Sequence, residues 1–178
     1  MSQQEHPGAD PLVALARKAV ESYVRARKVL DPEPLPGLEQ RRAGVFVSLH
    51  LPDGSLRGCI GTTQPTQQGI EDEIVRNAIS AATRDPRFYP LRPDELEGLD
   101  VSVDVLGAAE EVAGVEELDP KRFGIIVQTD DDRQALLLPD LEGVDTVEQQ
   151  VSITCRKGGI DPKRDKYRIL RFQVERHH

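Results

Sequence analysis

The sequence has no tryptophan, and aromatic residues make up only 4% of its 178 residues, so aliphatic side chains must fill the core. No apolar run approaches the roughly 20 residues that a membrane-spanning helix needs. The first residues also lack the basic and then apolar order of a signal peptide. Only two cysteines occur, Cys59 and Cys155, far apart in the chain, which predicts free thiols in a reducing compartment. These absences favour a cytoplasmic protein without a membrane partner.

Basic residues are in the minority: 23 Lys and Arg face 31 Asp and Glu, and the formal net charge is -8. Nucleic-acid binding normally depends on Lys and Arg that release the counterions of the phosphate backbone. The charge therefore argues against a nucleic-acid partner, although Arg156, Lys163, Arg164 and Lys166 form a local basic cluster. A composition of 38% hydrophobic and 30% charged residues is typical of a globular domain.

The periodicity of apolar residues predicts both helices and strands. Because these elements do not alternate in a β-α-β rhythm, we expect an α+β fold with mixed or antiparallel sheets. Residues 1–9 are expected to be a mobile tail, and residues 10–178 a single domain. The terminal His177 and His178 resemble the start of a purification tag and are left out of any metal assignment. Helices are predicted over residues 10–30, 70–84 and 146–157, and strands over 44–50, 56–61, 101–105, 124–128, 135–138 and 167–174.

The run Leu56-Arg57-Gly58-Cys59-Ile60-Gly61 is the one stretch whose residue types suggest a site. It follows a strand and a Pro52-Asp53-Gly54 turn, which predicts a hairpin. A two-residue loop places Cys59 opposite Ser48 and Arg57 opposite His50, with His50 diagonal to Cys59. A four-residue loop keeps this pairing, whereas a three-residue loop with a bulge breaks it.

This arrangement predicts a thiol and an imidazole on one face of the hairpin. A neighbouring arginine or protonated histidine lowers a thiol's pKa, because it stabilises the reactive thiolate. Glycines in a strand leave room for a ligand or for another backbone segment. The candidate catalytic residues are therefore Cys59 and His50, and the candidate binding residues are Arg57, Gly58, Gly61, Arg84 and Arg87.

A structural interpretation of the same residues stays open. Free cysteines are most often small buried hydrophobes, which also fits Cys155 within its predicted helix. Glycines within a strand are equally explained by a bulge or by a helix that packs closely. Metal binding by Cys59 and His50 would leave the ion with two ligands, which rarely suffice. We therefore predict no metal and no other cofactor.

The hexapeptide Leu56–Gly61 resembles the signature of the AMMECR domain family. The resemblance covers roughly residues 10 to 175 and includes, in order, Gly44–Leu49, Asp85–Phe88, Pro90-Leu91, Val101–Leu106, Leu136–Pro139 and Thr154–Lys157. It implies an α+β domain of two packed and intertwined subdomains, with the hexapeptide near a cleft between them. Microbial members are similar to protein A of the AmmeMemoRadiSam system, which implies a Memo-like protein and a radical SAM protein as partners.

Two functions follow from these observations. The first is a binding or accessory module, in which the face around Leu56–Gly61 holds a partner segment or a small anionic ligand. The second is a thiol enzyme, with Cys59 as the nucleophile, His50 as the base and Arg57 as the stabiliser of the thiolate and of an oxyanion. No third residue that would orient His50 can be identified, so the catalytic set is incomplete.

Overall fold

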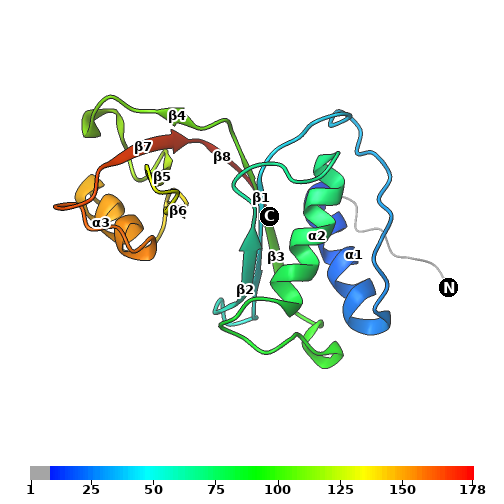
Figure 1. Cartoon of the computed structure of the whole chain (residues 1–178). Helices are drawn as coiled ribbons and strands as arrows, with labels where there is room; N and C mark the ends of the chain where they lie inside the picture. The colour runs from blue at the N-terminus through cyan, green and yellow to red at the C-terminus, as the bar shows by residue number, and fades with distance from the viewer. Residues whose placement is uncertain (1–8) are drawn as a thin grey trace. The chain divides into compact units, whose positions relative to one another are not determined.

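The computed structural model describes residues 9–178, and Figure 1 labels its main elements. The three predicted helices are present as α1 (Pro11–Ala26), α2 (Ile70–Thr83) and α3 (Val147–Lys157), with short 3-10 turns at Pro93–Glu95 and Val115–Glu117. The strands are β1 (Val45–His50), β2 (Leu56–Gly61), β3 (Asp100–Leu106), β4 (Glu110–Glu111), β5 (Gly124–Thr129), β6 (Gln134–Leu137), β7 (Tyr167–Phe172) and β8 (Val174–His177). They form two four-stranded antiparallel sheets, in the orders β2-β1-β3-β8 and β4-β7-β5-β6. The α+β class is confirmed, and the predicted tail lies, except for Ala9, outside the described residues.

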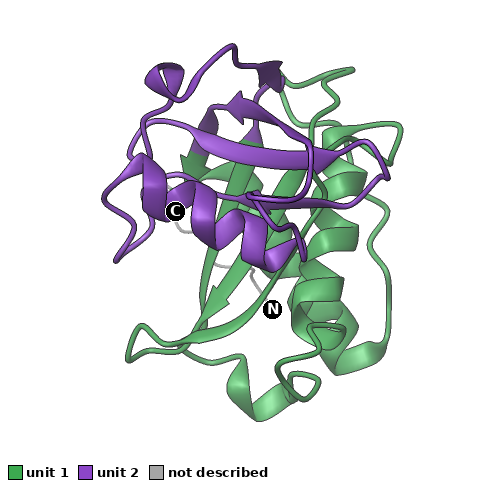
Figure 2. Ribbon diagram, turned by 60° about the vertical axis from the view of Figure 1, so that its left-hand side comes forward, with its two compact units in different colours: residues 1–105, 176–178 green, residues 106–175 purple. Residues whose placement is uncertain are grey.

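The chain divides into two compact units, which Figure 2 colours separately. Unit 1 contains the described residues up to Val105 together with residues 176–178, and unit 2 contains residues 106–175. Unit 1 is thus built from two separate stretches of chain, and β8 at the C-terminus joins the first sheet beside β3. The cleft expected between two subdomains stays a prediction.

The core of unit 1 lies between its helices and one face of its sheet. The α2 helix packs on β1 and β2, and α1 lies beside α2 (Figure 1). On β1 the side chains of Val45, Val47 and Leu49 are fully buried, as the alternating pattern predicts. Burying an aliphatic side chain of this size stabilises a fold by about 1.5–3 kcal/mol, so this face is a main source of stability.

The α1 helix begins as predicted and ends earlier than predicted. The Asp10 carboxylate accepts the N–H of Leu12 at 2.9 Å, and Pro11 occupies the first helical position. The helix was expected to reach residue 30, but it ends at Ala26 because Arg27 adopts a left-handed conformation (φ 54°). The N–H of Arg27 donates to the Tyr23 carbonyl at 2.8 Å and closes the last turn.

Unit 2 is centred on α3, which packs against β5 and β6. Thr146 and Gln149 form a capping box, in which each side chain accepts the backbone N–H of the other residue. Cys155 is 1% exposed and packs with Ile125 and Val127, so its interpretation as a buried helix residue is confirmed.

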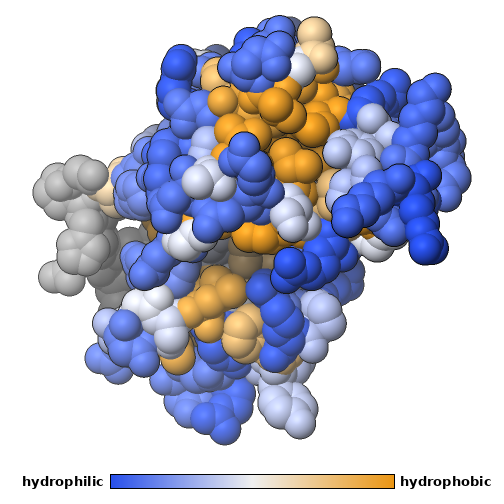
Figure 3. Space-filling view, turned by 90° about the vertical axis from the view of Figure 1, so that its left-hand side faces the viewer, coloured by the Kyte–Doolittle hydropathy of each residue, from blue (hydrophilic) through white to orange (hydrophobic). Residues whose placement is uncertain are grey.

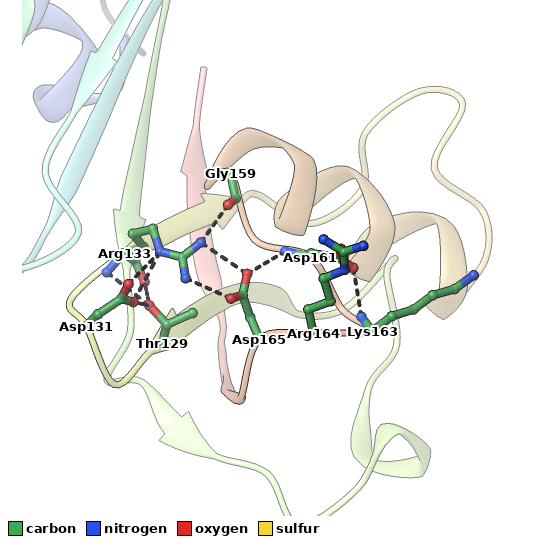
Figure 4. A network of polar contacts seen from close by, with 8 residues as sticks. All are labelled: Thr129, Asp131, Arg133, Gly159, Asp161, Lys163, Arg164 and Asp165. Carbon is green, nitrogen blue, oxygen red and sulfur yellow. Dashed lines mark hydrogen bonds and ion pairs between the residues drawn. The ribbon is translucent and has the colours of Figure 1, made fainter.

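The turn between β5 and β6 is tied to the loop after α3 by Arg133 (Figure 4). Its guanidinium donates to Asp131 at 2.9 Å, to Asp165 at 3.0 Å and to the Gly159 carbonyl at 2.7 Å. Hydrogen bonding to Arg133 is the main reason why the pKa of Asp165 lies below its ordinary value. The network crosslinks unit 2 through polar contacts at the edge of its core.

The last predicted strand, residues 167–174, is two strands in the structure. β7 ends at Phe172 in the second sheet, and β8 begins at Val174 in the first sheet. Gln173 lies between them, and its carbonyl accepts the N–H of Gly107 at 2.8 Å. The alternation of side chains continues across Gln173, so the sequence pattern does not reveal the change of sheet.

Some hydrophobic side chains reach the surface, and Figure 3 shows a hydrophobic patch among hydrophilic residues on the face drawn there. Over the described part of the chain, three large hydrophobic side chains are well exposed: Tyr89 (91%), Val29 (57%) and Val115 (56%). Single exposed apolar residues are common on soluble domains, but the near-complete exposure of Tyr89 stands out. Within residues 9–178, no helix is long and apolar enough to cross a membrane.

Candidate functional site

The hairpin that carries the hexapeptide has the predicted register at its centre. Cys59 lies opposite Ser48, and Gly58 lies opposite Leu49. The predicted pairing of His50 with Arg57 is wrong, because His50 lies opposite Leu56 and Arg57 is an extra residue in β2. Arg57 is therefore the site of a β-bulge.

The bulge follows from the length of the turn. The loop holds three residues, Pro52–Gly54, because the N–H of Leu51 donates to the Ser55 carbonyl at 2.9 Å. Gly54 takes the left-handed conformation (φ 83°) that such a loop requires. A three-residue loop changes the parity of the pairing, and the bulge at Arg57 changes it back. Cys59 and Ser48 therefore share a face, for a reason that differs from the predicted one.

Gly58 and Gly61 are packing positions in this structure. A Cβ at Gly58 would lie 2.2 Å from the Ala81 carbonyl oxygen of α2, and one at Gly61 would lie 2.2 Å from the Phe46 ring. Both distances are far below a van der Waals contact, so only glycine fits without a shift of its neighbours. The space that the sequence analysis assigned to a ligand is filled by the chain itself, in line with the alternative of a closely packed helix.

Asp85 caps the free edge of β2, which is an edge strand of the first sheet. The backbone N–H of Thr62 donates to the Val45 carbonyl, so these two residues form a hydrogen-bonded pair. Hydrogen-bonded and non-hydrogen-bonded pairs alternate along an antiparallel ladder, and the pair of Ser48 and Cys59 is the third one along, so it is a non-hydrogen-bonded pair. The Cys59 N–H therefore points outward, and it donates to Asp85 Oδ2 at 2.9 Å. A carboxylate at this place satisfies the donor and blocks pairing with another strand.

The same carboxylate holds Arg87. Arg87 donates to Asp85 through its backbone N–H at 3.0 Å and through its guanidinium at 2.7 Å and 3.0 Å. These hydrogen bonds are the largest reason why the pKa of Asp85 lies well below its usual range. The Asp85 side chain is 2% exposed, whereas that of Arg87 is 56% exposed. Asp85 thus holds the backbone and the guanidinium of Arg87 in place, while more than half of the Arg87 side chain stays accessible to solvent.

Arg57 holds the same stretch of chain further along, at Tyr89. Its guanidinium donates to both carboxylate oxygens of Glu95, at 2.9 Å and 3.1 Å, and to the Tyr89 carbonyl at 3.1 Å. This hydrogen bonding is the main cause that lowers the pKa of Glu95. The Arg57 side chain is only 12% exposed. Its guanidinium therefore supports the chain at Tyr89, and its bidentate partner is Glu95.

The thiol of Cys59 lies in an environment that disfavours the thiolate. Burial raises its pKa, while a hydrogen bond from Ser48 Oγ to Sγ at 3.2 Å and the charge of Arg87 act in the opposite direction. His50 lies two residues along β1 from Ser48 and opposite Asp100 of β3. Among the described residues, no hydrogen bond joins His50 to Cys59, and no group of three or more His, Cys, Asp or Glu could hold a metal ion.

The accessible part of this region is the segment that follows α2, residues 84–89, called the Arg84–Tyr89 segment below. Arg84 is the C-cap of α2 and is exposed, as are Arg87 and Tyr89. Two cations lie near the Phe88 ring: the guanidinium carbons of Arg87 and Arg57 are 5.5 Å and 5.8 Å from its centroid. The structure thus brings Arg87 and Cys59 together at Asp85. Arg57 lies beside the Phe88 ring and is bound to Glu95 instead, and His50 makes no hydrogen bond to Cys59.

Asp85 and Glu95 are the two central residues that the sequence analysis missed as site residues. The sequence analysis names Asp85 only within the Asp85–Phe88 stretch of the family resemblance, and it gives Glu95 no role. The signal was available for Asp85, because an aspartate before Pro-Arg at the end of a helix can accept N–H groups from its own turn. No local signal marks Glu95, because its partner Arg57 is 38 residues away.

Comparison with known proteins places the chain in a family. The AMMECR1 family model matches residues 13–177, which is nearly the whole chain. The chain belongs to the AMMECR1 family. The resemblance seen at Leu56–Gly61 is confirmed.

The chain is similar to proteins from bacteria and archaea. A Thermotoga maritima protein is 52% identical over 172 residues, which cover 96% of this chain and 98% of the relative. A Methanothermobacter thermautotrophicus protein is 39% identical over 180 residues and is covered to 92% of its length. A Clostridium acetobutylicum protein is 48% identical over 171 residues, but this chain spans only 36% of its length.

A solved structure has the same fold. The crystal structure of an uncharacterized protein from Pyrococcus horikoshii matches with a TM-score of 0.82 at 32% identity and covers 93% of this chain and 88% of its own. The AMMECR1 relatives thus establish the family and the fold, and they supply no activity.

Proposed function

We propose that this AMMECR1 chain is a protein-binding module, and that the Arg84–Tyr89 segment is its recognition surface. The observation that carries the proposal is Tyr89, which is 91% exposed on a segment tied down at several points. Tyrosine and arginine are the residue types that most often dominate the binding energy of protein interfaces.

The ties make the segment a preorganised surface. Asp85 holds the N–H and guanidinium of Arg87, and Arg57 holds the Tyr89 carbonyl. The Leu91 N–H donates to the Ala82 carbonyl at 2.7 Å and fixes the chain just beyond. A surface that is ordered before binding loses little conformational entropy when a partner docks.

The chemistry of the segment indicates the partner. Arg84 and Arg87 add positive charge to a protein of net charge -8. We therefore expect a partner with an apolar pocket for the Tyr89 ring and an acidic rim for the arginines. The Memo-like and radical SAM proteins implied by the family resemblance are the partners to test first, and a small anionic ligand at Arg87 is the alternative.

The thiol-enzyme alternative has less support. Burial raises the pKa of Cys59, and Arg57 is engaged by Glu95. A nucleophile of this kind needs a thiolate at neutral pH.

The proposal is tested by calorimetric titration of the purified chain with each of the two partner proteins. We expect Tyr89→Ala and Arg87→Ala to weaken the binding of one partner about tenfold or more. Val29→Ala is the matched control, because Val29 is also an exposed side chain of unit 1, at 57%. The proposal fails if neither partner binds, or if Tyr89→Ala and Val29→Ala bind equally well.

A further inference from the structure

Unit 2 contains a cavity of about 370 Å³ beside the short strand β4 (purple in Figure 2). Its walls include Glu110, Phe123, Arg171 and Phe172, together with Gly107 and Gln173. This volume lies at the lower end of the range for sites that bind small molecules. The cavity is distinct from the Arg84–Tyr89 segment, and the inference below does not rest on the proposed function.

Two phenylalanines form the apolar walls. Phe172 is 2% exposed, and its ring lies over Gly124, where a Cβ would be only 2.3 Å away. The Phe123 ring is partly buried, and the guanidinium carbons of Arg171 and Arg122 lie 4.6 Å and 5.2 Å from its centroid. The Arg171 guanidinium thus lies over an aromatic wall.

Arg171 is only partly neutralised. Its Nη1 donates to the Glu117 carbonyl at 2.7 Å, and its Nη2 lies 3.6 Å from a Glu110 carboxylate oxygen. The second contact is longer than a hydrogen bond, and the Glu110 side chain is 69% exposed, whereas Arg171 is 29% exposed. Ion pairs this exposed contribute little, so Glu110 is a weak partner that a ligand can displace.

The geometry points to a small monocarboxylate with an apolar or aromatic body as the ligand of this cavity. The ligand's carboxylate would take the place of Glu110 at Nη2 of Arg171, and its body would pack against Phe123 and Phe172. A planar carboxylate suits the edge of a guanidinium. A dianionic phosphate would meet stronger repulsion from the nearby Glu110 carboxylate.

Benzoate is a suitable probe, and its binding can be monitored through the amide chemical shifts of the full-length chain. Benzylamine is the control, because it has a similar body and the opposite charge. A probe this small is expected to bind in the millimolar range, with saturating shifts at Gly107 and Phe123. Glu110→Gln should tighten benzoate binding about threefold, because it removes the competing carboxylate. Glu148→Gln changes the net charge equally at an exposed position of α3 and should leave benzoate binding unchanged.

Arg171→Gln should weaken benzoate binding about tenfold. Because this change can also loosen β7, the decisive variant is Glu110→Gln, whose side chain is exposed. The inference is overturned if benzoate gives no saturating shifts with the wild type, if benzylamine binds as tightly, or if Glu110→Gln leaves benzoate binding unchanged or weaker. Tighter binding of inorganic phosphate than of benzoate would also overturn it.

Discussion

The signature strand β2 and the Arg84–Tyr89 segment are joined by hydrogen bonds, yet they differ in what they expose. In β2, Gly58 and Gly61 are filled by neighbouring atoms of the chain, and the outward N–H of Cys59 is capped by Asp85. In the segment, Arg87 and Tyr89 turn most of their surface outward. The difference teaches that the most distinctive residues of the sequence build the support, whereas their less distinctive neighbours form the accessible surface.

The largest expected effect is at Gly58. Gly58→Ala should destabilise the fold by about 3 kcal/mol, because its Cβ would press on the backbone carbonyl of Ala81, which cannot move alone. Gly54→Ala is the matched control: its Cβ would meet nothing within 4 Å, so only the left-handed strain of about 1 kcal/mol remains. Urea unfolding measures the loss of stability in both variants. Equal losses for the two variants would show that β2 has room beside Gly58.

Asp85→Asn should lower the free energy of unfolding by about 2 kcal/mol at neutral pH, because the buried carboxylate accepts hydrogen bonds from both Cys59 and Arg87. Asp94→Asn is the control, since Asp94 forms an exposed ion pair with Arg92 and should change stability by less than about 1 kcal/mol. Chemical unfolding at a series of pH values measures the difference from the wild type.

The pH dependence of that difference has a definite sign. Arg87 holds the pKa of Asp85 well below the value of about 3.9 expected in the unfolded chain. A carboxylate with a lowered folded pKa stabilises fully above its unfolded pKa, and the stabilisation is lost as the pH falls through the folded pKa. The cost of Asp85→Asn should therefore be constant above about pH 5 and shrink below about pH 4. A cost that stays constant from pH 7 down to about pH 2.5 would contradict this role of the ion pair.

Cys59→Ala should have a smaller effect, about 1 kcal/mol, from the lost hydrogen bond with Ser48 and the lost contact of the sulfur. If the thiol is a structural group, this variant should still bind the partner as the wild type does. A loss of partner binding at full stability would move the recognition surface onto β2.

Tyr89→Ala should change the free energy of unfolding least, by less than about 0.5 kcal/mol, because the side chain is 91% exposed. The same variant is expected to lose partner binding, so stability and recognition separate at this position. Thermal unfolding of Tyr89→Ala, compared with that of Val29→Ala, checks the predicted effect on stability. A clear destabilisation would mean that the ring packs in solution.

The fold class and much of the hairpin could be predicted from the sequence, because they depend on local periodicity. Alternation of apolar residues predicted the strand over residues 44–50, in which Val45, Val47 and Leu49 are buried, and helical spacing predicted α2 to within one residue of its end at Thr83. The pairing of Cys59 with Ser48 was also correct. These features need only neighbouring residues and regular strand geometry.

The roles of the individual site residues could not be derived in the same way. Ala81 fills the space at Gly58, and Glu95 binds Arg57 from 38 residues away, so both contacts depend on how separate elements pack. The bulge at Arg57 compensates for the length of the turn, and a one-residue compensation leaves no trace in an alternating pattern. Arg57 is bound by Glu95, and Arg87 rather than Arg57 is the cation that acts on the Cys59 thiol.

The central claim is that the signature strand is a support whose thiol is structural, and the rate of Cys59 alkylation against pH tests it most directly. A Cys155→Ser background leaves Cys59 as the only thiol of the chain, and intact mass follows its alkylation. We predict slow alkylation with an apparent pKa above that of a free cysteine, because burial raises the pKa of Cys59, and little change in His50→Ala or Arg57→Ala. Rapid alkylation below neutral pH that is lost in His50→Ala would contradict the account and favour a thiol enzyme.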